Sequence, residues 1–134
     1  MASDRLRSNR SGKIVILDSN AILMLFEFSI DLESELIRLL GFFEIVVPSP
    51  IVDELKFLSK KGKGKQKIIS KPALELTKNY KIVKTEGKGD EAVLLLAKKL
   101  NAMVLTNDKE LRNRVKQLGL HNIFLRGKSK LEID

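Results

Sequence analysis

Residues 14–23 read Ile-Val-Ile-Leu-Asp-Ser-Asn-Ala-Ile-Leu, and their pattern indicates the type of fold. It opens with four consecutive apolar residues, three of them β-branched, which is typical of a strand buried on both of its faces. An acid, Asp18, follows at once, and apolar residues then recur with helical spacing over residues 20–28. A buried strand that leads directly into a helix is the repeating unit of a parallel sheet, because parallel neighbours need a crossover connection.

The same unit recurs along the chain. Further short apolar runs occupy residues 44–47, 80–83, 102–105 and 122–125. Segments with helical periodicity lie between the runs, over residues 31–41, 50–60, 71–79, 89–100 and 107–118. Asp31 stands where an N-cap belongs, Gly41 closes that helix, and Asn107 with Glu110 has the spacing of a capping box. The alternation predicts an α/β fold, with a mainly parallel sheet of about five strands flanked by helices.

The composition limits the class of protein. The 134 residues include 43% hydrophobic residues, enough for one globular domain, and no cysteine. A thiol nucleophile, a Cys-rich zinc site and a disulfide are therefore excluded, which fits a reducing cytoplasm. No apolar run reaches the roughly 20 residues of a membrane helix, so we expect a soluble cytoplasmic protein with no membrane partner. A net charge of +8 favours a polyanionic partner, above all nucleic acid.

The basic residues predict how the chain is divided. Residues 1–13 are expected to be a flexible basic N-terminal arm, residues 14–126 the folded domain, and residues 127–134 a C-terminal tail. Residues 60–71 are rich in lysine and glycine, so we expect a mobile basic loop there. The candidate phosphate contacts are Lys60, Lys61, Lys63, Lys65, Lys67, Lys71, Arg126, Lys128 and Lys130. The alternative for each of these cations is a solvated, solubilising surface charge.

Acids stand where the predicted strands end. Asp18 follows the first strand, Asp108 lies shortly after the fourth, and Asp90 is at the start of a predicted helix. Asp53 and Glu54 lie in the first turns of another helix. Ligands of a parallel α/β sheet bind at the carboxyl ends of its strands, so we expect these side chains at one edge. Each acid alone also has a structural explanation, as an N-cap or as a charge at the positive end of a helix.

Several carboxylates at one edge repel each other, and a divalent cation relieves that repulsion. Ligands that are all oxygen, without cysteine or a nearby histidine, suit Mg²⁺ or Mn²⁺ rather than Zn²⁺. Such an ion lowers the pKa of a bound water and offsets the charge of a phosphodiester, and hydrolysis requires both effects. The acidic edge of this basic protein therefore predicts a metal-dependent nuclease.

Four ordered segments resemble motifs of the PIN-domain ribonucleases. They are residues 16–23 with Leu-Asp-Ser-Asn-Ala, 48–55 with Val-Asp-Glu-Leu, 89–94 with Gly-Asp-Glu-Ala, and 104–111 with Leu-Thr-Asn-Asp. The resemblance spans residues 14–125 and implies a three-layer α/β/α sandwich, cleavage of RNA with Mg²⁺ or Mn²⁺, and a homodimer. By position it identifies four catalytic and metal-binding acids, Asp18, Glu54, Asp90 and Asp108. It gives supporting roles to Ser19, Asn20, Glu91, Thr106 and Asn107, and it leaves Asp53 as a charge near a helix N-terminus.

The lysine-rich segment and residues 125–130 resemble an archaeal-type PIN subgroup, which is similar both to toxin nucleases of the VapC kind and to proteins of ribosomal RNA processing. The hypothesis is therefore an endoribonuclease with an antitoxin or a ribosome-assembly partner. The alternative is an RNA-binding ribosome-assembly factor that keeps the fold without cutting. Residues 87–92 also satisfy the G-x-G-x-x-A spacing of a dinucleotide site, but Asp90 and Glu91 would repel a pyrophosphate. No cofactor besides the metal is predicted.

Overall fold

A six-stranded sheet forms the centre of the protein, in a computed structural model that describes residues 13–134. The strands are β1 (Lys13–Leu17), β2 (Phe43–Pro48), β3 (Lys81–Val83), β4 (Met103–Leu105), β5 (Asn122–Arg126) and β6 (Lys130–Ile133). Their order is β3-β2-β1-β4-β5-β6, and all neighbours are parallel except β5 and β6. The predicted N-terminal arm lies outside the described residues, apart from Lys13, which begins β1.

Six helices accompany the described strands. They are α2 (Ser19–Glu27), α3 (Leu32–Leu40), α4 (Ser49–Lys61), α5 (Gly64–Thr77), α6 (Gly89–Leu100) and α7 (Lys109–Gln117). Helix α3 begins and ends as the sequence predicts, because the Asp31 carboxylate accepts from the Ser34 N–H and Gly41 closes the helix with φ of 74°.

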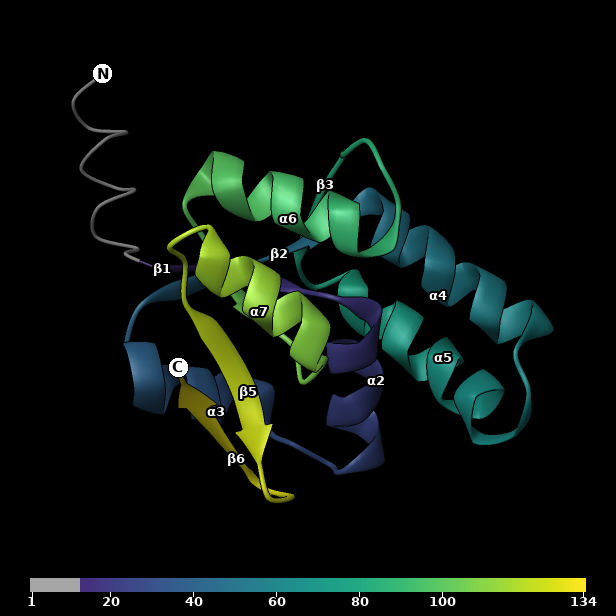
Figure 1. Cartoon of the computed structure of the whole chain (residues 1–134). Coiled ribbons are helices and arrows are strands. Elements are labelled where there is room, and N and C mark those ends of the chain that lie inside the picture. Colours follow the sequence, from purple (N-terminus) through teal and green to yellow (C-terminus); the bar gives the residue numbers. More distant parts are fainter. Residues whose placement is uncertain (1–12) are drawn as a thin grey trace.

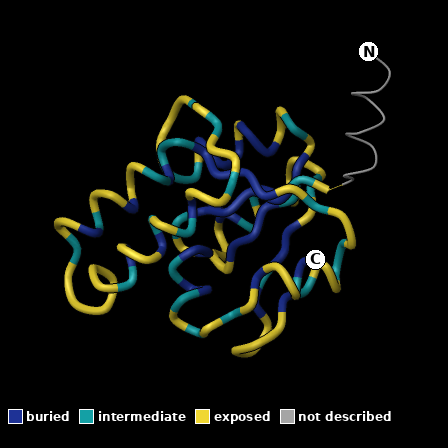
Figure 2. Tube along the Cα trace, turned by 180° about the vertical axis from the view of Figure 1, so that it is seen from behind, coloured by how far each residue is buried: buried dark blue, intermediate teal, exposed yellow. Residues whose placement is uncertain are grey.

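The elements form three layers, which confirms the predicted α/β/α architecture. Helices α6 and α7 pack on one face of the sheet and α2 and α3 on the other, while α4 and α5 form a hairpin that extends to the side (Figure 1). The central strand β1 is buried on both faces, and Val15, Ile16 and Leu17 have no exposed surface. Figure 2 shows buried residues along the middle strands and exposed residues at the far end of the hairpin.

The order of the strands reverses direction between β1 and β4. From β1 the chain proceeds to β2 and β3 on one side, and it then crosses over to β4 and continues to β5 and β6 on the other. Connections that leave neighbouring strands in opposite directions open a crevice at the carboxyl ends of those strands. The strand order therefore makes the carboxyl ends of β1 and β4 the expected position of a ligand, and we refer to this position as the crevice.

The prediction of a mobile loop at residues 60–71 is wrong. Lys60 and Lys61 end α4, and the remaining lysines belong to α5 or to the turn of residues 62–63 that joins the two helices. Helices α4 and α5 pack closely against each other, and α5 buries Ser70, Ala73 and Thr77. This packing outweighs the low helix propensity of the glycines and the mutual repulsion of the lysines in this segment.

The prediction of a C-terminal tail at residues 127–134 is also wrong, because these residues contain a sixth strand of the sheet. Strand β6 pairs antiparallel with β5, and its Leu131 is fully buried. Helix α3 holds the backbone of Leu131 from the side: the Leu131 N–H donates to Glu35 Oε1 at 2.8 Å, and Arg38 Nη2 donates to the Leu131 carbonyl at 2.7 Å. These contacts join residues that are far apart in the sequence, so the local pattern of residues 127–134 does not predict them.

Candidate active site

The carboxylate of Asp18 lies at the end of β1, where the strand order reverses. Asp18 is the N-cap of α2, and its Oδ1 accepts a hydrogen bond from the Ala21 N–H at 2.7 Å. Its Oδ2 accepts from Thr106 Oγ1 at 2.8 Å. Only 5% of the residue's surface is exposed. The two bonds fix the orientation of the carboxylate, and both stabilise its charged form.

Thr106 connects Asp18 to the second acid of the site, Asp108. Its buried hydroxyl donates to Asp18 and accepts from the Asp108 N–H at 3.1 Å. The Asp108 carboxylate is the N-cap of α7, where Oδ1 accepts from the N–H groups of Glu110 and Leu111. Asp108, rather than the Asn107 of the predicted capping box, therefore begins this helix. The ends of the adjacent strands β1 and β4 are thus joined through one hydroxyl group.

Asp90 is the third acid of this group, from the first turn of α6. Burial raises the pKa of Asp18 to about 6, and the charges of Asp90 and Asp108 add to the rise, although the bonds from Ala21 and Thr106 oppose it. Burial also raises the pKa of Asp90, together with the charge of Asp108. Both shifts therefore arise first from burial, and the repulsion between neighbouring carboxylates adds to them.

Glu91, the acid next to Asp90, forms an ion pair with Arg114. Its Oε2 lies 2.7 Å from Arg114 Nη2 of α7. Arg114 also lowers the pKa of Asp90 in opposition to burial. Sequence reasoning missed Arg114, because helical periodicity places it on the surface and only the packing of α6 beside α7 brings it to these acids.

Glu54 belongs to a neighbouring hollow. It is exposed on α4 and lines a cavity of about 650 Å³ together with Gly87, Lys88 and Gly89, the residues just before Asp90. Asp53 lines the same cavity. The start of α4 and the β3–α6 loop are held together, because the Thr85 N–H donates to Ser49 Oγ at 3.2 Å. Glu54 is therefore beside the acidic group rather than packed into it.

Residues 13–134 contain no cluster of three or more acidic, histidine or cysteine side chains close enough to hold a metal ion as they stand. The chemistry of the donors nevertheless fits a hard cation. Asp18, Asp90 and Asp108 offer only oxygen, and together they place an excess of negative charge at one edge, which contributes, after burial, to the raised pKa values of Asp18 and Asp90. A cation would relieve that excess, and the exposed Glu54 and Asp108 side chains have room to turn.

The predicted polar companions differ in what they contact. Thr106 contacts both Asp18 and Asp108, as described above. Asn107 instead binds backbone: its Oδ1 accepts from the Leu125 N–H at 2.7 Å, and its Nδ2 donates to the Leu125 carbonyl at 3.1 Å. Asn107 therefore clamps the β4–α7 connection to β5. Ser19 and Asn20 begin α2, and Asn20 lines a hollow of about 490 Å³ with Lys65 and Gln66.

The candidate phosphate contacts lie on two hairpins. Those of residues 60–71 are on the α4–α5 hairpin, and those of residues 126–130 are on the β5–β6 hairpin. Two of them already have anionic neighbours: Lys65 Nζ lies 3.7 Å from Glu27, and Arg126 Nε lies 2.8 Å from Glu132. The remaining candidates form no ion pair among residues 13–134.

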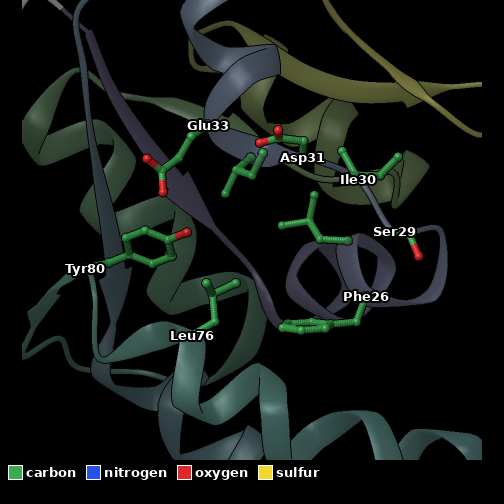
Figure 3. Close-up of a pocket in the computed structure, with 9 residues that line it drawn as sticks. Phe26, Ser29, Ile30, Asp31, Glu33, Leu76 and Tyr80 are labelled. Atoms are coloured by element: carbon green, nitrogen blue, oxygen red, sulfur yellow. The ribbon is translucent and has the colours of Figure 1, made fainter.

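Another hollow, of about 430 Å³, contains none of the four predicted catalytic acids. Figure 3 shows Phe26, Leu76 and Tyr80 on its walls, with Glu33 near the phenol. Burial raises the pKa of Tyr80 to about 12, and the charge of Glu33 contributes. Tyr80 directly precedes β3, so this hollow belongs to the opposite end of the sheet. Among residues 13–134, none of the helices has both the length and the apolar character needed to cross a membrane.

Known proteins resemble this chain in sequence. Ribonuclease VapC4 from Methanocaldococcus jannaschii is 39% identical over 124 residues, which cover 89% of this chain and 95% of that protein. Ribonuclease VapC9 from Archaeoglobus fulgidus is 28% identical over 134 residues, 100% of this chain and 98% of that protein.

Solved structures share the fold. The PIN domain endonuclease Utp24 superimposes with a TM-score of 0.74 at 22% identity, over 90% of each chain. A chain of VapBC2 from Rickettsia felis, solved with a promoter DNA fragment, gives 0.59 at 18% identity, over 81% of this chain and 98% of that one. A sequence profile described as a PIN like domain matches residues 15–128, which include all four predicted acids. The sequence match, the strand order and the acids at the carboxyl edge agree: the chain belongs to the PIN-like domain family.

Proposed function

We propose that this protein is a metal-dependent endoribonuclease that hydrolyses RNA phosphodiesters at the crevice between β1 and β4. The observation that carries the proposal is the buried Asp18 carboxylate, held by Thr106 beside Asp90 and Asp108. Burying a carboxylate among others is costly for stability, and such costs concentrate at functional sites. The names of the two archaeal relatives, both ribonucleases, support RNA as the substrate.

In this proposal the four acids share one task, and neighbouring groups orient them. PIN-domain ribonucleases generally use a divalent metal ion, and Asp18, Asp90 and Asp108, with Glu54 from the adjoining hollow, would hold Mg²⁺ or Mn²⁺. When bound, such an ion supplies a water of lowered pKa and a counter-charge for the phosphodiester. Thr106 and the Ala21 N–H keep both oxygens of Asp18 oriented. The carboxylate therefore does not have to reorient during the reaction. Glu91 keeps Arg114 beside Asp90.

The flanking cations would bind the RNA backbone. Lys60, Lys61, Lys63, Lys65, Lys67 and Lys71 present charge from the α4–α5 side, while Arg126, Lys128 and Lys130 present it from the β5–β6 side. Positive charge on both flanks attracts a polyanion and leaves the centre to the acids. Bound RNA would therefore run along the carboxyl edge of the sheet.

A toxin role with an antitoxin partner is the biological setting that we favour. Both archaeal relatives carry the VapC name, and chains from VapBC complexes share the fold. A role in ribosomal RNA processing is the alternative setting, and there the resemblance to Utp24 extends to the fold alone. A homodimer and a cytoplasmic location complete the proposal, and sedimentation equilibrium of the purified protein tests the dimer.

The central test is RNA cleavage by the purified protein. Single-stranded and ribosomal RNA are incubated with Mg²⁺, Mn²⁺ or EDTA, and the Asp18→Asn/Asp108→Asn double variant runs in parallel. Asp31→Asn is the matched control, because Asp31 caps α3 in the same way but lies away from the crevice. We expect cleavage that requires metal, disappears in the double variant and persists in the control. Salt-sensitive RNA binding by the wild type without any cleavage would favour a non-catalytic assembly factor instead.

A further inference from the structure

We propose that the hollow beside Glu54 is a subsite that holds one RNA nucleotide next to the cleaved bond and prefers a base with an exocyclic amino group. The inference rests on the proposed function, because it takes RNA as the substrate. It assigns a role to Phe57, Asp53, Lys84 and Lys88, none of which belongs to the acidic group.

The position of the hollow suits a neighbouring nucleotide. It lies between the start of α4 and the β3–α6 loop, and its walls include Glu54 and Gly89, the residue before Asp90. Strand β3 ends at Val83, so Lys84 stands at the same carboxyl edge as Asp18. The volume of about 650 Å³ falls within the range of pockets that hold small ligands.

Phe57 provides a surface on which a base can stack. It lies four residues after Asp53 and three after Glu54, so the three side chains share one face of α4. The residue remains 62% exposed, although its ring lines the hollow. An exposed aromatic ring is a typical platform for single-stranded nucleic acid, because every base has a flat face to stack on it.

Lys84 and Lys88 place positive charge on the opposite wall. Both are exposed, and neither forms an ion pair in the part of the chain that the structure describes. The hydrogen bond from the Thr85 N–H to Ser49 Oγ connects this wall to the start of α4. Two cations opposite an aromatic ring match a nucleotide, with its phosphate on the lysines and its base on Phe57.

Asp53 determines which base fits. Its carboxylate repels phosphate and accepts hydrogen bonds from amino groups, so it favours the base side of the nucleotide. Adenine, cytosine and guanine carry an exocyclic amino group, whereas uracil offers two carbonyl oxygens at the corresponding positions. The hollow should therefore disfavour uridine.

The first experiment detects stacking directly. The chain has no tryptophan, so Phe57→Trp introduces a single indole reporter. Phe42→Trp is the matched control, because Phe42 is 77% exposed and precedes β2 at the opposite end of the sheet. Both variants carry Asp18→Asn to prevent cleavage and are titrated with oligo(A), oligo(C) and oligo(U) tetranucleotides. We expect saturable quenching only with the Phe57→Trp reporter, with oligo(U) at least about fivefold weaker and the difference abolished by Asp53→Asn.

The second experiment measures cleavage of a randomised RNA. Phe57→Ala should raise KM at least about fivefold, leave kcat within about twofold, and remove the bias against uridine beside the cut. Phe42→Ala should change none of these values. Equal quenching with both reporters, or an unchanged KM and bias while the wild type cuts, would overturn the subsite. A wild type that cuts no RNA would refute the proposed function, and the fluorescence titration would still decide whether the hollow binds nucleotides.

Discussion

One side chain, Asp18, has two roles, because its carboxylate caps the N-terminus of α2 and also lies beside Asp90 and Asp108. The sequence alone offers these two roles as alternatives for an aspartate at the end of a strand. The positions of Asp18 and Asp108 at the carboxyl edge could be predicted, because both follow strands in the sequence. The hydroxyl bridge through Thr106 could not, since it joins residues 88 positions apart.

The burial of Asp18 should make stability depend on pH. The pKa of this group is about 6 in the folded protein and near 3.8 in the unfolded chain, so the folded state binds the proton more tightly. The resulting stabilisation is complete below pH 3.8 and is lost as pH rises through 6. Unfolding by urea in EDTA should show the wild type losing roughly 3 kcal/mol relative to Asp18→Asn between those limits. A difference that does not vary with pH would contradict the assignment.

Thr106 should matter through its hydroxyl rather than its shape. Thr106→Val removes the donor to Asp18 and the acceptor for the Asp108 N–H, and leaves both groups without that partner. We expect a loss of roughly 1–3 kcal/mol in the free energy of unfolding and an at least tenfold loss of cleavage, with Thr106→Ser close to wild type. Thr77→Val is the control, because that buried hydroxyl donates only within α5. Equal effects of the two valine variants would point to general core damage.

Among the helices, α5 shows where the local pattern was insufficient, because the first half of this helix lies in the segment predicted as a loop. The strands and the other helices could be predicted to within a few residues, because their apolar spacing is regular. The lysine-rich segment has little such spacing, and its helices depend on packing against each other. Strand β6 was missed for a related reason, since its contacts with Glu35 and Arg38 span more than ninety positions.

The turn between α4 and α5 should tolerate no side chain at Gly62. A Cβ there would lie 2.4 Å from the Leu58 carbonyl oxygen, so the end of α4 must shift to make room. We expect Gly62→Ala to lower the free energy of unfolding by about 1–3 kcal/mol. Lys63→Ala, one residue on and exposed, should stay within about 0.5 kcal/mol of wild type. If urea titrations show equal stability for both variants, the hairpin is looser than its packing indicates.

For the molecule as a whole, charge should control RNA affinity. Replacing Lys61, Lys63 and Lys65 together with glutamine removes three cations from the hairpin, so binding should weaken and the slope of log K against log salt should flatten by up to about 2. A control triple at Lys81, Lys98 and Lys99 removes the same charge at the opposite end of the sheet. Filter binding with single-stranded RNA in EDTA measures both, and equal slopes would mean that the hairpin lysines contact no phosphate.

The reversal of strand order between β1 and β4 has a consequence for any inactive form of this protein. The crevice follows from the connections of the chain, so it survives when the acids are replaced. A protein without its carboxylates would keep the flanking cations and meet less repulsion from RNA. Such a variant should act as a decoy: added in excess to the active enzyme, it would occupy the transcript and shield it from destruction.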